Sequence, residues 1–288
     1  MIAVAADRRP CRDVVVALPR AAASRGVASL HRCVVVAALT LAVAACGAAG
    51  ATDAEATRKA DFHYKLANGH YQAGNLELTV VELMRAFDFE PEHADARYLY
   101  GVVLFGRKQY ETAVDQCRRA LRAAPGLFAA RNLLGATYVA LERWPEAITA
   151  LEPLLKEPTY TTPYLAHNNI GWAYLKLGSY RQAEKHLQMS VFINPKFCNG
   201  HRNLAVLAEE RGDPTGALEH LDDAMKHCPK VADFHLQRGE LLARAGKVLK
   251  AEEAFCTCME IANKERLGKR CRGWVERLAR QGGHGVCP

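Results

Sequence analysis

The pattern of apolar and polar positions repeats itself at a long fixed interval between residues 60 and 262. The stretch 164–197, YLAHNNIGWAYLKLGSYRQAEKHLQMSVFINPKF, predicts two short helices with a turn at Gly178-Ser179. Pro195 ends the second helix because proline has no N–H to donate. Large apolar residues fill the space between the helices, and small residues occupy the points where the helices must approach closely. These small residues are Gly171, Ala183 and Ser190.

The same pattern returns 34 residues later, which is typical of stacked helical hairpins. Aligning the chain on the proline that closes each unit predicts six repeats: 60–93, 94–127, 128–163, 164–197, 198–231 and 232–262. The third unit is irregular because Pro153 falls inside its second helix. We expect a kinked helix there, a connection two residues longer, and the weakest joint of the stack. Residues 263–288 fit a capping helix and tail, which a helical stack needs at its open end.

The repeat resembles the tetratricopeptide repeat, and the resemblance covers about 204 residues in register. It implies an all-α fold, a right-handed superhelical solenoid of six helix–turn–helix repeats. In such a fold, the first helix of each pair lines the concave face.

The start of the chain predicts export. Residues 33–45 form an apolar run behind Arg25 and Arg32, which is too short to span a bilayer and has the size of a signal-peptide core. The run ends at Cys46, and the small residues around it resemble a bacterial lipobox. We therefore expect a lipoprotein signal peptide at 1–45, a covalent lipid on Cys46 and a flexible tether at 46–59. Because residues 1–26 are long and mixed for a signal peptide, we hypothesise that translation begins near Val27.

Net charge gives no sign of a nucleic-acid partner. The formal charge is +7, but the first 45 residues hold six Arg against two Asp, which leaves 32 basic and 29 acidic groups, or +3, for the remainder. These charges are interspersed rather than gathered into blocks, so no basic patch is predicted.

Six cysteines in the C-terminal half suit disulfides in an oxidising compartment. Cys198 opens the fifth repeat and Cys228 closes it, so this pair is our first choice. Cys271 is expected to join Cys258 or Cys256, and Cys287 would take the other. A redox-active or metal-binding CxC at 256–258 is the alternative, without a second CxC or CxxC to support it. Cys117 lies at a buried repeat position and is predicted to be a free thiol.

No catalytic, cofactor or metal motif is present in the sequence, and we expect no enzyme activity and no small-molecule substrate. Histidine recurs at the fourth position of the first helix in four repeats, where a metal site and simple packing are the alternatives. Equivalent positions lie about 20 Å apart along such a stack, too far to share an ion, so packing is favoured. These residues are His63, His167, His201 and His235.

A protein-binding groove is the predicted working surface. First-helix residues that stacking does not need combine aromatic rings, which supply buried area, with amides that can bond a peptide backbone. The expected groove residues are Tyr64, Asn68, Tyr71, Tyr98, Val102, Phe105, Asn132, Val139, Asn168, Trp172, Leu175, Arg202 and Val206.

A lipidated chain of six such repeats resembles the type IV pilus pilotins, the PilF/PilW/Tgl group. The repeat NNIGWAYLKLGSYRQAEKHLQMSVFINP and the following HRNLAVLAEERGD carry this resemblance. It implies an outer-membrane lipoprotein on the periplasmic face that binds secretin subunits and promotes their multimerisation. Gly47 rather than Asp after Cys46 agrees with outer-membrane sorting. The alternatives are a general periplasmic scaffold lipoprotein in envelope assembly and an envelope redox protein that uses the C-terminal cysteines.

Overall fold

The computed structural model describes residues 53–263, 266–285 and 287, and all regular structure within these ranges is helical. The predicted signal peptide at 1–45 and the predicted lipidation site Cys46 lie outside the described residues. Among the helices described, none combines the length and apolar character needed to cross a bilayer. The chain divides into two compact units, one ending at His93 and one beginning at Ala94.

The first unit is a single helical hairpin, made of a helix at 53–72 and α2 (Leu76–Phe89). The expected flexible tether is wrong for residues 53–59, which are already helical. This segment contains alanines and charged residues that favour helix, and Glu55 Oε1 lies 2.7 Å from Lys59 Nζ one turn later. Asn75 begins α2 by accepting a hydrogen bond from the Leu78 N–H, as N-cap residues do.

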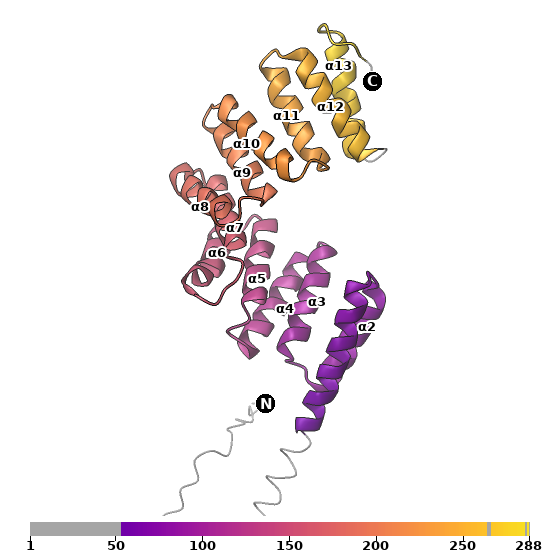
Figure 1. The fold of residues 1–288 in the computed structure, drawn as a ribbon. Helices are drawn as coiled ribbons and strands as arrows, with labels where there is room; N and C mark the ends of the chain where they lie inside the picture. Colours follow the sequence, from indigo (N-terminus) through magenta and orange to yellow (C-terminus); the bar gives the residue numbers. More distant parts are fainter. Residues whose placement is uncertain (1–52, 264–265, 286, 288) are drawn as a thin grey trace, which may run out of the picture. The chain divides into compact units, whose positions relative to one another are not determined.

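The second unit holds five hairpins followed by one more helix, and Figure 1 shows their order along the chain. Each predicted repeat from the second to the sixth contains one hairpin, and a 3₁₀ helix, η1, follows α6. The helices are α3 (Ala94–Gly106), α4 (Tyr110–Ala123), α5 (Phe128–Ala140), α6 (Trp144–Leu151), η1 (Glu152–Lys156), α7 (Pro163–Lys176), α8 (Tyr180–Ile193), α9 (Cys198–Glu210), α10 (Pro214–His227), α11 (Ala232–Arg244), α12 (Val248–Ala262) and α13 (Arg266–Ala279).

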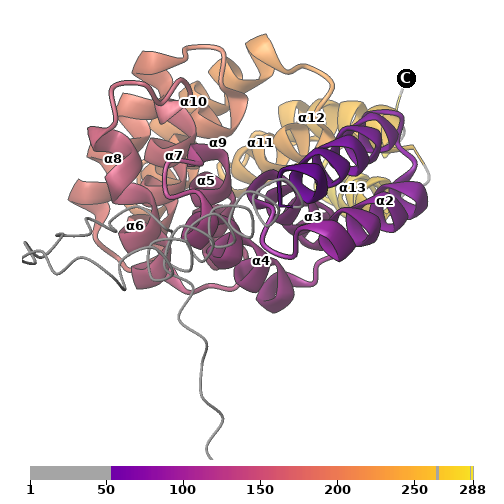
Figure 2. The same cartoon turned by 90° about the horizontal axis from the view of Figure 1, so that it is seen from below.

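The first helices of neighbouring hairpins form a continuous inner layer in most of the second unit. Each of α3, α5 and α7 packs on the next first helix as well as on its own hairpin partner, and α11 packs on α13 in the same way. The second helices instead pack on the first helix of the following hairpin, as α4 does on α5 and α8 on α9. This pattern, which can be followed in Figure 2, places the first helices inside and the second helices outside.

The step from α9 to α11 is held differently. Here α11 packs mainly on α10, and ion pairs reach across the step. Arg238 Nε lies 2.8 Å from Asp222 Oδ1, and Arg202 Nε lies 3.3 Å from Asp233 Oδ2. Because such charges stay partly hydrated, they contribute less to this joint than its buried apolar cluster does. In that cluster Phe234 and Leu241 of α11 pack with residues of α9 and α10.

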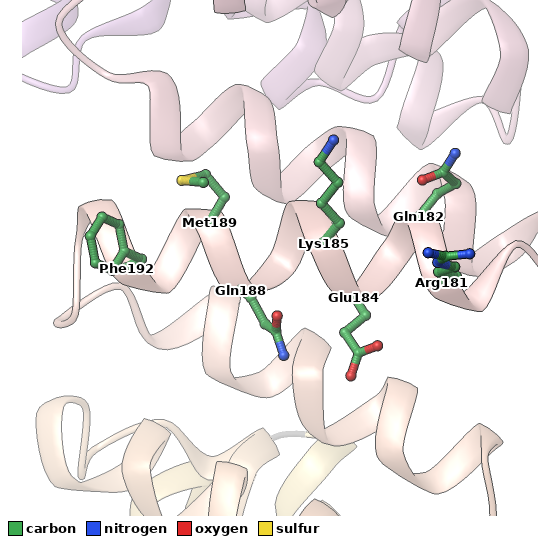
Figure 3. A pocket seen from close by; sticks show the side chains of 7 residues that line it. All are labelled: Arg181, Gln182, Glu184, Lys185, Gln188, Met189 and Phe192. Carbon is green, nitrogen blue, oxygen red and sulfur yellow. The ribbon is translucent and has the colours of Figure 1, made fainter.

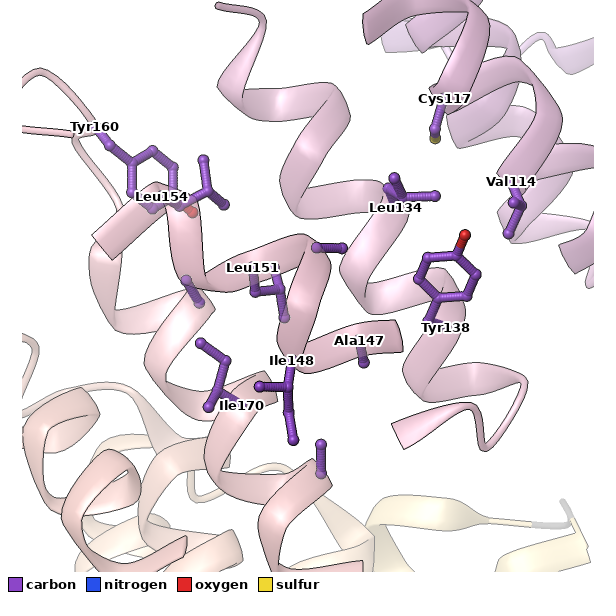
Figure 4. Packing of buried hydrophobic residues seen from close by; sticks show 13 residues of the cluster. Val114, Cys117, Leu134, Tyr138, Ala147, Ile148, Leu151, Leu154, Tyr160 and Ile170 are labelled. Carbon is purple, nitrogen blue, oxygen red and sulfur yellow. The ribbon is translucent and has the colours of Figure 1, made fainter. Parts of the chain in front are cut away.

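The third repeat departs from the predicted kink. Helix α6 ends after Leu151, and the chain continues as η1, since Pro153 cannot donate to the preceding turn. The joint is also not open, because Leu154 of η1 is 1% exposed and Tyr160 in the following connection is 8% exposed. Both belong to a buried cluster that runs from α4 to α7, shown in Figure 4. The prediction of a weak joint at this repeat is therefore wrong.

Close approach of the two helices in a hairpin depends on glycine. A Cβ added at Gly135 of α5 would lie 2.2 Å from Leu151 Cγ, and one at Gly171 of α7 would lie 2.7 Å from Leu187 Cγ. Both leucines are 0% exposed, so neither has room to turn away. The recurring small residue of the repeat is thus explained by a direct contact between the first and second helix.

We predict that Gly135→Ala lowers the free energy of unfolding by about 1–3 kcal/mol, because the added methyl overpacks a filled site. Gly273→Ala in α13 is the matched control, since a Cβ there meets nothing within 4 Å. It should leave stability unchanged or raise it by up to about 1 kcal/mol through better helix propensity. Urea unfolding followed by circular dichroism measures both; equal effects of the two substitutions would refute the packing argument.

Candidate functional site

The inner layer of the second unit presents half-buried side chains from successive first helices. We call this set the first-helix face. Its members combine aromatic rings, aliphatic chains, one amide and one guanidinium, and none is fully buried. They are Tyr98, Val102 and Phe105 on α3, Asn132 and Val139 on α5, Trp172 on α7, and Arg202 and Val206 on α9.

Trp172 lies near the middle of this face. It packs beside the cluster formed by Leu175, Leu204 and Leu207, and Lys176 Nζ lies 4.7 Å from the centre of its ring system. A cation at this distance from an indole ring is attracted to it. One part of the Trp172 ring is thus fixed by the buried cluster, and another part remains exposed to a partner.

Two predicted groove residues are buried inside the stack instead. Asn168 is 8% exposed, and its Oδ1 accepts a hydrogen bond of 2.8 Å from Nδ2 of Asn203 in the next repeat. Leu175 is 4% exposed and belongs to the core. Sequence spacing alone could not separate these residues from Trp172, because all three lie on the same helix and differ only in how the neighbouring hairpin covers them.

Asn132 and Arg202 have polar atoms that the fold leaves without a hydrogen bond. The Asn132 Oδ1 atom is shielded from solvent and accepts none within the described residues. Arg202 Nε forms an ion pair with Asp233, but its N–H does not point at that carboxylate, so no hydrogen bond results. Because both atoms are covered, a partner can bond them only if these side chains turn outward.

The other three predicted groove residues belong to the first unit. Tyr64, Asn68 and Tyr71 lie along the helix at 53–72 and are half-buried. The Tyr64 ring lies 5.5 Å from the ring of His93, whose Nε2 is 2.9 Å from Asp61 Oδ1.

A second surface, which sequence analysis missed, lies on the outside of α8. A shallow hollow of about 780 Å³ is lined by Arg181, Gln182, Glu184, Lys185, Gln188, Met189 and Phe192. Figure 3 shows these side chains spreading from one helix. Phe192 is 78% exposed and Glu184 is already paired with Arg211 at 2.9 Å. The apolar residues Met189 and Phe192, three positions apart on an otherwise polar helix face, were the available signal.

A polar contact between the two helices recurs in several hairpins at the predicted histidine position. His63 Nδ1 lies 2.6 Å from Glu82 Oε2, and the next repeat replaces this pair by Arg97 and Gln116. In the fourth repeat His167 Nδ1 lies 3.1 Å from His186 Nδ1. Burial, with repulsion from His186 and Lys185, lowers the pKa of His167 to about 4.

The six C-terminal cysteines come together in three pairs. Cys198 and Cys228 lie with their Cα atoms 6.2 Å apart. The cap is joined to α12 by Cys258 with Cys271, also at 6.2 Å, and by Cys256 with Cys287 at 5.4 Å. All three separations suit disulfides. The two cysteines of the CxC belong to different pairs, so the motif does not form a dithiol of its own.

Comparison with known families agrees with this geometry. A model of the tetratricopeptide repeat matches residues 132–196 and 202–256. A model described as anaphase-promoting complex, cyclosome, subunit 3 matches residues 77–154. The chain thus contains tetratricopeptide repeats in both matched ranges.

Relatives of this repeat protein include pilus assembly factors. The type IV pilus assembly protein PilF of Pseudomonas aeruginosa is 25% identical over 143 residues, a match that covers 50% of this chain and 57% of that protein. The chain thus spans little more than half the length of this curated relative.

Two solved structures share the fold. The type IV pilus biogenesis factor PilW superposes with a TM-score of 0.66 at 21% identity, over 73% of this chain and 97% of that one. The structure of Pseudomonas aeruginosa PilF gives a TM-score of 0.62 at 19% identity, over 76% and 99%. The predicted all-α repeat fold and the resemblance to this group are confirmed.

We predict that native Cys117 resists alkylation, because it is buried and burial raises the pKa of its thiol to about 12. After unfolding without reductant, one of the seven cysteines in the described residues should react, since six are paired and one is free. After reduction all seven should react. Peptide mass spectrometry of protein exported in its native compartment identifies the labelled sites; six reactive C-terminal thiols without reductant would contradict the pairing.

We also predict a loss of stability on mild acidification that involves the His167–His186 pair. Between pH values of about 6.5 and 4 the unfolded chain protonates His167 while the folded protein does not, so lowering the pH favours unfolding. The part of the free energy of unfolding that depends on neutral His167 is fully present above pH 6.5 and is lost as the pH falls toward 4.

The change in urea midpoint between neutral pH and pH 5 should be smaller in His167→Gln than in the wild type. Gln188→Ala, an uncharged substitution on the exposed side of α8, is the control and should retain the wild-type change. An unaltered pH response in His167→Gln would show that this pair does not contribute.

Proposed function

We propose that this repeat protein is an assembly factor for type IV pilus biogenesis that binds secretin subunits and promotes their multimerisation. The names of its relatives support the pilus role, and the first-helix face of the second unit supports the binding role. The proposal includes no bond-making step, since a repeat surface of this kind acts by holding another polypeptide.

The observation that carries the proposal is the continuity of the first-helix face. Helices α3, α5, α7 and α9 pack directly on one another, so their exposed side chains form one surface. Four helices about 10 Å apart span about 30 Å, enough for an extended segment of about nine residues. The hollow on α8, in contrast, is lined by a single helix and offers a shorter contact.

The chemistry of the face suits an extended segment of a protein. Tyr98, Phe105 and Trp172 offer aromatic area that gains from being covered, and the half-buried Asn132 and Arg202 side chains can bond backbone groups through their exposed parts. Affinity would come mainly from the rings, whereas the polar atoms would fix the direction of the bound segment.

Membrane attachment is the second part of the proposal. A lipid on Cys46 would hold the protein at the periplasmic face of the outer membrane, and the residue after it, Gly47, agrees with that destination. Anchoring raises the local concentration of the binding surface where secretin subunits arrive. A general periplasmic scaffold lipoprotein would use the same face for a different client and remains the alternative.

Complementation of a deletion strain tests the role and the surface together. Without the gene, heat-stable secretin multimers in membranes should fall at least about 10-fold, a loss of about 1.4 kcal/mol in assembly free energy if it reflects affinity alone. The wild-type gene should restore them, and Tyr98→Ala/Trp172→Ala should not. Phe192→Ala, which removes an exposed ring from α8, is the matched control and should restore multimers fully.

Circular dichroism melting of the purified double variant must first show that it folds. Normal multimer levels in the deletion strain would exclude the pilotin role. If Phe192→Ala fails and the double variant works, the binding surface is on α8 instead.

Cys46→Ser should place the protein in the soluble periplasmic fraction if the anchor is a lipid.

A further inference from the structure

The fifth repeat contains a cluster of nitrogen and oxygen ligands that the binding role does not use. His201 on α9 faces His220 and Asp223 on α10, and one ligand atom from each lies within 4.8 Å of the others. The row of first-helix histidines cannot share an ion, but this cluster joins one member of that row to two residues of the opposite helix. We propose that His201, His220 and Asp223 form a binding site for a divalent transition-metal ion such as Zn²⁺.

The tautomer of His201 is fixed in the form that binds metals. Its Nε2 lies 2.9 Å from the carbonyl oxygen of Pro195, and since a carbonyl only accepts, Nε2 carries the proton. Nδ1 of the neutral ring therefore has a lone pair. That atom is shielded from solvent and has no hydrogen-bond partner in the described residues. A ligand nitrogen held in this way by a backbone carbonyl is the usual arrangement at protein metal sites.

Comparison with the other hairpins shows that the unpartnered nitrogen is specific to this repeat. At the equivalent positions His63 bonds Glu82, Arg97 bonds Gln116, and the His167–His186 pair closes at 3.1 Å. His201 and His220 make no such bond within the described residues. A buried polar atom without a partner destabilises the fold, and a bound cation would remove that cost.

His235 provides an internal control for this reading. It occupies the same position in the sixth repeat, and its Nε2 lies 2.8 Å from the carbonyl oxygen of Pro229. The residues opposite it, at the positions of His220 and Asp223, are Ala254 and Thr257, which leave it without further metal ligands. The backbone bond is thus a general feature of these repeats, whereas the three-ligand cluster is not.

The types of side chain in the cluster suit a transition-metal ion. Two imidazoles and one carboxylate are a ligand set that Zn²⁺ accepts, with bonds of about 2.0–2.2 Å and a fourth position left for water or a partner's side chain. Asp223 is exposed, so its carboxylate can rotate inward to complete the site.

Binding would clamp α9 to α10, the two helices whose ends Cys198 and Cys228 bring together. This predicts that Zn²⁺ stabilises the folded protein, because the unfolded chain does not hold the three ligands in place.

The test is calorimetric titration of chelator-stripped, unreduced protein with Zn²⁺. The wild type should bind one ion at a site that His220→Ala weakens by about 100-fold or more and Asp223→Asn by about 10-fold. Two matched controls, His235→Ala and Asp222→Asn, should change affinity less than about 2-fold, since Asp222 pairs with Arg238 and points away from the cluster. Zn²⁺ should raise the melting temperature of the wild type but not of His220→Ala.

A Co²⁺ titration of the same proteins gives a spectroscopic readout of coordination that does not depend on stability. Circular dichroism establishes that each variant folds. Absence of Zn²⁺ binding in the wild type would overturn the proposal, as would binding that survives His220→Ala. A loss in Asp222→Asn as large as in Asp223→Asn would show only general attraction to acidic side chains, and would overturn it too.

Discussion

The contact on which this structure depends is the one between the two helices of a hairpin, where a small residue of the first helix lets the second helix approach. At Gly135 and Gly171 the second helix approaches so closely that a fully buried leucine occupies the space of a Cβ. This contact sets the distance between first and second helices, and every hairpin built on it presents the same surfaces to its neighbours. The stack follows, since similar units in the same contact repeat a similar step. Repetition of one local contact is also why the all-α fold could be predicted from the sequence.

The packing of first helices on one another has a further consequence for binding. Where first helices pack on one another, their outward side chains form a continuous surface. Trp172 is part of this surface, and one side of its ring packs against a buried cluster. The second helices are farther apart, so each one meets solvent alone. An exposed ring such as Phe192 therefore lies on a short surface, although its own exposure is greater. Continuity rather than exposure distinguishes the two candidate faces, because a polypeptide partner gains area by crossing several helices.

The sequence pattern predicts features that depend on the period of the repeat. It does not predict which side chains the neighbouring hairpin buries. The end of α8 before Pro195 and the approach of Cys198 to Cys228 depend on local order, and the structure has both. Asn168 was predicted to face a partner, but Asn203 of the next repeat covers it. Pro153 predicts a kinked α-helix. The chain instead forms a 3₁₀ helix there, and Leu154 of this helix is buried in the joint. The His201 cluster does not follow from the period of the first-helix histidines, because His220 and Asp223 lie on the opposite helix.

The C-terminal end of the stack has stabilising contacts of its own. In a stack whose units contact only their neighbours, the terminal units have one partner each and open first. The C-terminal end compensates with α13, whose Trp274 ring stacks on Phe255 at 5.3 Å, and with cysteine pairs that join the cap to α12. At the step before it, from α9 to α11, the first helices pack less on one another, although Phe234 and Leu241 of α11 are buried in one cluster with Ala205 of α9. Charged contacts add to this joint. Cys198 and Cys228 approach each other at one end of the fifth hairpin, and the proposed metal site lies between its two helices. A disulfide and a bound ion would therefore hold the same pair of helices together.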